Sequence, residues 1–175
     1  MSSDSASGAL TTMGIDERLF RAIVASVQDA LAMCGREARC VGVSSVTPGE
    51  AGTVTAMIGV HGNVTGFVVV NMTDLVAMKT VGGLLQEEFE RISVQVVDGI
   101  GEIANIIAGS IKARIAKTEY AFGQITVPSV IVGRGYQVAF GKGSNFLTVS
   151  FEHKDDQTFS ADDRLLRVSL SLIKL

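Results

Sequence analysis

The stretch from Ile92 to Ile115 limits the possible folds of this chain more than any other part of the sequence. It is long and mostly apolar, and at about 100° per residue its large aliphatic side chains fall on one face of a helix. That face consists of Ile92, Val96, Ile100, Ile103, Ile107 and Ile111. The stretch is too polar to span a bilayer, because it also carries Asp98, Glu102, Asn105, Lys112 and Arg114. We therefore predict a core helix over about 92–117.

The opposite face of this predicted helix carries an unusual polar stripe. Its members recur at spacings of four, three, four and three residues and share one narrow arc: Asp98, Glu102, Asn105, Gly109 and Lys112. Exposed helix positions usually hold long side chains, whereas Asn, Asp and Gly each disfavour a helix interior by several tenths to about 1 kcal/mol. Gly101 and Gly109 would also lower the surface around the stripe. Two interpretations stay open: a preorganised surface for a partner, or glycines that allow tight packing beside solvated polar groups.

The rest of the pattern predicts strands on both sides of a helical pair. A first amphipathic helix is expected from Asp16 to Met33, and another over about 74–85. Strands are expected over 40–46, 53–60, 64–71, 122–132, 136–140, 146–152 and 165–174. This order indicates an α+β fold, with a largely antiparallel sheet covered by long helices on one face. It also suggests a duplicated unit of one long helix plus about three strands.

Composition fits one globular, cytoplasmic domain. The 175 residues are 47% hydrophobic and 19% charged. We expect a flexible tail over 1–14, which is rich in Ser, Thr, Ala and Gly, and a single domain over 15–175. The net charge of −3 argues against nucleic-acid or anionic-membrane partners, and no signal peptide is evident. Cys34 and Cys40 lack the ligand spacing of a zinc site, so we expect reduced thiols and no metal site.

The polar stripe also resembles a family signature. The run Asp98-x-x-x-Glu102-x-x-Asn105-x-x-x-Gly109 is similar to the signature of the CheC/CheX/FliY phosphatases. Two strands, over 65–70 and 126–133, resemble strands of the same family, so that the likeness covers about 52–175. One Glu-x-x-Asn occurs here, whereas the CheC branch usually carries two. The chain therefore resembles the CheX branch, which implies a CheC-like pseudo-duplicated fold and a homodimer joined through sheet edges.

The resemblance implies an activity and a role for each residue of the site. The substrate would be the aspartyl phosphate of a CheY-type response regulator, and Mg²⁺ would be held by that regulator rather than by this chain. Asn105 would orient the attacking water, and Glu102 would pair with the regulator's lysine. Asp98, Gly101 and Gly109 would support docking. The alternatives are a non-catalytic CheX-like binding or dimerisation module and a structural part of the flagellar switch.

Overall fold

A computed structural model describes residues 10, 14–45, 53–136, 138–139, 144–153 and 160–175. Their helices are α2 (Glu17–Met33), α3 (Asp74–Leu85), α4 (Val94–Ile115) and the short 3₁₀ turn η1 (Asp162–Arg164). Their strands are β1 (Ala38–Ser44), β2 (Val54–Gly62), β3 (Val64–Met72), β4 (Phe122–Ile125), β5 (Ser129–Val132), β6 (Asn145–His153) and β7 (Leu165–Lys174).

The strands form one antiparallel sheet in the order β1-β6-β7-β3-β2-β4, with β5 pairing further along β2. Each half of the chain supplies a long helix, an edge strand and a hairpin. The first half gives α2, β1 and the hairpin β2–β3, and the second gives α4, β4 with β5, and the hairpin β6–β7. Each edge strand pairs with the hairpin of the other half. The predicted duplication is therefore confirmed, and the two halves exchange their edge strands.

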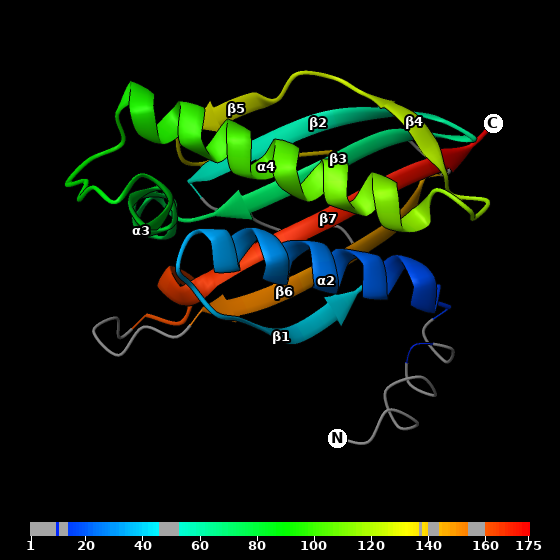
Figure 1. Ribbon diagram of the computed structural model, residues 1–175, viewed down its shortest axis with the longest axis horizontal. Coiled ribbons are helices and arrows are strands. Elements are labelled where there is room, and N and C mark those ends of the chain that lie inside the picture. Colours follow the sequence, from blue (N-terminus) through cyan, green and yellow to red (C-terminus); the bar gives the residue numbers. More distant parts are fainter. Residues whose placement is uncertain (1–9, 11–13, 46–52, 137, 140–143, 154–159) are drawn as a thin grey trace.

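The helices cover one face of the sheet, as predicted. Figure 1 shows α2 and α4 side by side across that face, with α3 at one end. The hydrophobic core lies between this helical layer and the inward side chains of the central strands. Along β3, for example, Val64, Val68 and Val70 are buried on the helical side, while Phe67 on the other side is 41% exposed. Toward the Met72 end of β3 the other side is covered as well, because Val69 and Asn71 are also buried.

Helix α4 has the apolar face that the sequence predicts. Ser93 caps it, because its hydroxyl accepts a hydrogen bond from the backbone N–H of Val96 at 3.3 Å. The predicted core residues from Val96 to Ile111 are buried, and Ile92 lies just before the helix and packs against the core. By length and composition alone α4 could cross a membrane, so its polar residues do not by themselves exclude a membrane span. In the structure α4 is a core helix, because half of its most apolar 18-residue stretch is buried within the domain.

The two other helices also begin at caps that the sequence provides. The carboxylate of Asp16 accepts hydrogen bonds from the backbone N–H groups of Arg18 and Leu19, so α2 begins where it was predicted to begin. The hydroxyl of Thr73 accepts from the N–H of Val76 and starts α3.

Some predictions differ from the structure. The strand expected over 122–132 is divided into β4 and β5 at Pro128, because proline cannot continue a ladder of hydrogen bonds. The strand expected over 136–140 is not formed at 136, 138 and 139, while 137 and 140 lie outside the described residues. Most of the tail expected over 1–14 also lies outside them, but Leu10 is buried in the core, and its carbonyl accepts a hydrogen bond from the N–H of Ile15 at 2.9 Å.

Candidate active site

The structure places the predicted polar stripe along the outer ridge of α4. Asp98 and Glu102 are exposed, and Asn105, Gly109 and Lys112 are partly exposed. Within the part of the chain that the structure describes, no hydrogen bond or ion pair engages the side chains of Glu102 or Asn105. Both functional groups are therefore available to a partner. Residues three apart on a helix are surface neighbours, so one partner group can meet both.

The inner side of α4 is held in place by two glycines. A Cβ on Gly99 would lie 2.6 Å from a methyl carbon of Val81 in α3, and a Cβ on Gly101 would lie 3.3 Å from Pro128. These contacts fix the rotation of α4 about its axis, and with it the direction of the ridge. Gly101 is buried. The expectation that it lowers the exposed surface was therefore wrong, because its missing side chain serves packing within the chain.

Gly109 differs from both of these glycines. A Cβ added there would meet no atom within 4 Å, so nothing inside the described structure requires glycine at this position. Gly109 lies one turn beyond Asn105 on the same ridge and is partly exposed. The space above it is open to another molecule.

The carboxylates of Asp98 and Glu102 share the N-terminal part of the ridge. They stand four residues apart, and two like charges at this spacing on a helix disfavour folding by a few tenths of a kcal/mol. Neither carboxylate has a basic partner among the described residues. This end of the ridge therefore attracts a cation.

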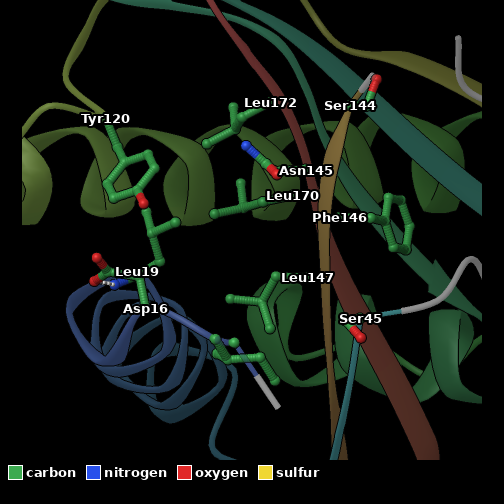
Figure 2. A pocket seen from close by; sticks show the side chains of 12 residues that line it. Asp16, Leu19, Ser45, Tyr120, Ser144, Asn145, Phe146, Leu147, Leu170 and Leu172 are labelled. Carbon is green, nitrogen blue, oxygen red and sulfur yellow. Dashed lines mark hydrogen bonds between the residues drawn. The ribbon is translucent and has the colours of Figure 1, made fainter. Parts of the chain in front are cut away.

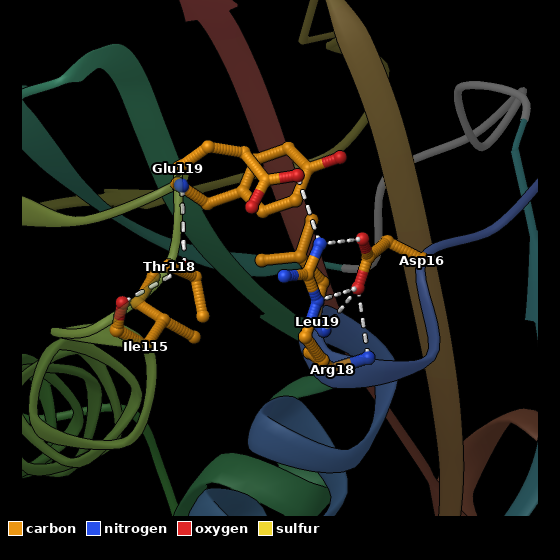
Figure 3. Close-up of polar contacts among 7 residues, drawn as sticks. Asp16, Arg18, Leu19, Ile115, Thr118 and Glu119 are labelled. Carbon is orange, nitrogen blue, oxygen red and sulfur yellow. Dashed lines mark hydrogen bonds and ion pairs between the residues drawn. The ribbon is translucent and has the colours of Figure 1, made fainter.

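A separate pocket lies at the N-terminal end of α2. Its volume is about 300 Å³, and Figure 2 shows Asp16, Tyr120 and Asn145 around it, together with leucines from α2, β6 and β7. Beside it, Arg18 forms ion pairs with Asp16 at 2.6 Å and Glu119 at 2.8 Å, as Figure 3 shows. These hydrogen bonds from Arg18 hold the pKa of both carboxyls below their ordinary values. The network joins α2 to the loop after α4, and no residue of the ridge takes part in it.

The cysteines and acidic residues suggest no second chemical centre. Cys34 and Cys40 are free, and burial raises the pKa of both thiols, which lowers their reactivity at neutral pH. Among the described residues, no group of three or more His, Cys, Asp or Glu side chains is arranged to hold a metal ion.

Comparison with protein families identifies the fold and the family together. A family model described as "Chemotaxis phosphatase CheX" matches residues 54–152, which is more than half of the chain. The chain belongs to the CheX family. The match spans β2 to most of β6 and includes the whole ridge of α4. A search of curated proteins gave no significant match.

Solved structures give the same fold. A CheC-like superfamily protein from Shewanella sp. PV-4 has a TM-score of 0.77 at 18% identity, and covers 90% of this chain and 99% of its own. The chemotaxis protein CheX from Vibrio vulnificus has a TM-score of 0.75 at 19% identity, with 88% and 98% covered. CheX from Borrelia burgdorferi, in a complex with CheY, BeF₃ and Mg²⁺, has a TM-score of 0.70 at 22% identity, with 90% and 97% covered. The pseudo-duplicated CheC-like architecture is thus shared with these proteins.

Two features of the site region were missed from sequence. The packing of Gly99 against Val81 depends on how α3 crosses α4, and no local sequence pattern predicts this crossing. The division of the strand at Pro128 could have been predicted, because a proline inside a strand-like run marks an edge strand or an interruption. The gap is bridged by Thr126, whose N–H donates to the carbonyl of Gly59 at 2.9 Å.

Proposed function

We propose that this protein hydrolyses the aspartyl phosphate of a CheY-type response regulator in the cytoplasm. The observation that carries the proposal is the pairing of Glu102 and Asn105 on a rigid, exposed ridge where the described chain gives neither side chain a partner. The family model is that of a chemotaxis phosphatase. The related Borrelia burgdorferi structure contains CheX with CheY, which supports a partner of this class.

Asn105 would position the nucleophile. Hydrolysis requires a water molecule in line with the bond that breaks, and catalysis of phosphoryl transfer is mainly positioning and electrostatic stabilisation. A side-chain amide can both donate to and accept from a water without changing its charge. The water oxygen would bond to phosphorus while the bond to the aspartate oxygen breaks. The products are the regulator's free carboxylate and dihydrogen phosphate, which keeps both protons of the water.

Glu102 would set the register of the complex. Its carboxylate stands one turn before Asn105 and would form a charged hydrogen bond with the regulator's active-site lysine. The neighbouring Asp98 would add negative charge at the same end of the ridge. We propose that Mg²⁺ is bound by the regulator, where it neutralises charge on the phosphoryl group.

We also propose that two copies associate through sheet edges, so that a dimer carries two sites. Strand β1 forms one edge of the sheet, and its Val41 is 44% exposed. Light scattering after size exclusion should give the mass of a dimer, and Val41→Lys should reduce it if this edge is the interface. A monomeric wild-type protein at assay concentrations would contradict the dimer.

The decisive test of the activity is phosphate release. Regulators of the CheY type from the same genome are phosphorylated with acetyl phosphate and Mg²⁺, separated from the excess, and mixed with catalytic amounts of the protein. We expect decay much faster than the spontaneous rate for at least one regulator. If none decays faster but one binds, the non-catalytic binding module becomes the better explanation. Assembly into a large ring without hydrolysis would instead favour a structural part of the flagellar switch.

A further inference from the structure

A hollow of about 600 Å³ continues the ridge of α4 beyond Asn105. One wall is the C-terminal half of α4, with Gly109, Lys112 and Ala113, and the other is β4, with Phe122 and Ile125. Gly109 follows Asn105 by four residues, which is about 6 Å along the helix axis. A molecule that reaches Asn105 therefore lies directly beside this hollow.

Gly109 gives the hollow its open end. Glycine in a helix interior is unfavourable relative to alanine, and Gly99 and Gly101 are explained by close neighbours within the chain. Gly109 has no such neighbour within 4 Å of an added Cβ. Gly109 therefore disfavours the helix without relieving a contact within the described structure, and it lies between Asn105 and the hollow.

Charge divides the ridge into two ends. Asp98 and Glu102 lie before Asn105, and Lys112 lies two turns after it. No ion pair within the described residues involves Lys112, which is partly exposed at the hollow. A partner that fits this ridge presents a cation at one side of its phosphoryl group and an anion at the other, with a slender backbone segment between them.

We infer that Gly109 and Lys112, with the hollow beside them, form a second docking contact for the phosphorylated regulator. This inference rests on the proposed function and deepens it. The hollow receives a backbone segment of the receiver domain that carries an acidic side chain, and Lys112 pairs with that side chain. Glu102 fixes one end of the complex and Lys112 the other, so that Asn105 is held over the phosphorus atom. The contact also selects among regulators, because the segment must be both slender and acidic.

The first test fills the hollow. Gly109→Leu is compared with Ala32→Leu, an exposed position of α2 that lies outside the hollow. We expect Gly109→Leu to fold with a melting temperature at or above that of wild type and to raise KM for the acetyl-phosphate-treated regulator at least tenfold. Ala32→Leu should leave KM unchanged. Equal KM values for wild type and Gly109→Leu would overturn the inference.

The second test reverses the charge. Lys112→Glu is compared with Lys117→Glu, an exposed change of the same size outside the hollow. We expect Lys112→Glu to raise KM at least tenfold at low salt, with kcat at saturation within about twofold of wild type. The loss should shrink as salt rises, because exposed charge pairs are screened. An equal loss in both variants would mean a general charge effect and would overturn the role of Lys112.

Binding separates this inference from the proposed activity. The same variants are titrated with the regulator bound to beryllofluoride and Mg²⁺, where hydrolysis does not occur. If wild type hydrolyses phosphate but Gly109→Leu and Lys112→Glu bind as tightly as it does, the docking contact is wrong and the activity stands. If wild type binds without hydrolysis and both variants bind weakly, the contact stands and the activity is wrong. Absence of both binding and hydrolysis with every CheY-type regulator of the genome overturns both.

Discussion

Helices α2 and α4 occupy equivalent places in the two halves of the molecule, yet they differ in what they expose. When their caps, Asp16 and Ser93, are aligned, every buried position of α2 coincides with a buried position of α4. Those of α2 are Leu19, Ala22, Ile23, Ser26, Val27, Ala30 and Leu31. Their counterparts in α4 are Val96, Gly99, Ile100, Ile103, Ala104, Ile107 and Ala108, and all of them are buried. The core therefore requires the same pattern in both halves.

The outer positions do not coincide in chemistry. Glu102 and Asn105 align with Ala25 and Gln28 of α2. The amide of Gln28 donates to the backbone carbonyl of Ala38 at 3.2 Å, so it is engaged within the chain. A helix in this fold thus does not need a free Glu-x-x-Asn pair to pack. Glu102 and Asn105 are therefore not required by the architecture, and we infer that they serve a partner.

The largest expected effect comes from removing the amide of α4. Asn105→Ala should lower kcat for phosphate release about 100-fold, because loss of precise positioning of the water has effects of this order. KM should change little. Gln28→Ala is the matched control on α2 and should keep full activity. Wild-type turnover by Asn105→Ala would remove the catalytic distinction between the two helices.

Removal of the carboxylate should have the next largest effect. Glu102→Ala should lower kcat/KM about 10- to 100-fold, since a hydrogen bond to a charged group contributes about 1.5–3 kcal/mol. Both KM and kcat should be affected, because docking and register are lost together. Ala25→Glu places the same charge on α2 and should change neither constant. A Glu102→Ala enzyme with normal kinetics would mean that the regulator's lysine is recognised elsewhere.

A smaller effect is expected on stability at Gly99, which occupies the position in α4 that Ala22 occupies in α2. Gly99→Ala should lower the free energy of unfolding by about 1 kcal/mol or more, because overpacking costs about 1–3 kcal/mol and exceeds the gain in helix propensity. The β-branched side chain of Val81 has little freedom to move aside. Urea unfolding should therefore show non-additivity between Gly99→Ala and Val81→Ala. Additive effects would mean that the two residues are not in contact.

The smallest expected effect is on pH dependence. Arg18 lowers the pKa of Asp16 and Glu119 from their ordinary values of 3.8 and 4.5. A lowered pKa in the folded state means stability that is present above the ordinary value and is lost as pH falls through the lowered one. Between pH 5 and pH 3, the melting temperature should therefore fall less in Arg18→Ala than in wild type. Arg21→Ala removes a charge from the same helix, and its melting temperature should fall as much as that of wild type.

Local signals predicted most of the fold. The start of α2 at Asp16 and the apolar face of α4 each depend on residues close in sequence, and the structure has them where they were expected. The outward direction of Glu102 and Asn105 followed from helical spacing in the same way. The burial of Gly101 did not, because it depends on Pro128, which lies between β4 and β5 and comes much later in the chain. The role of a helical glycine is set by what crosses the helix, and spacing does not contain that information.

The exchange of edge strands has a consequence for how this chain can be divided. Strand β1 completes the hairpin β6–β7, and β4 with β5 completes the hairpin β2–β3. A half-length fragment would therefore lack the edge of its own sheet, and it could recover that edge from a second copy of itself. The topology is that of a strand-swapped dimer joined into a single polypeptide. In a dimer of identical halves the two outer ridges would be equal, whereas in this single chain α4 carries Glu102 and Asn105 where α2 carries Ala25 and Gln28.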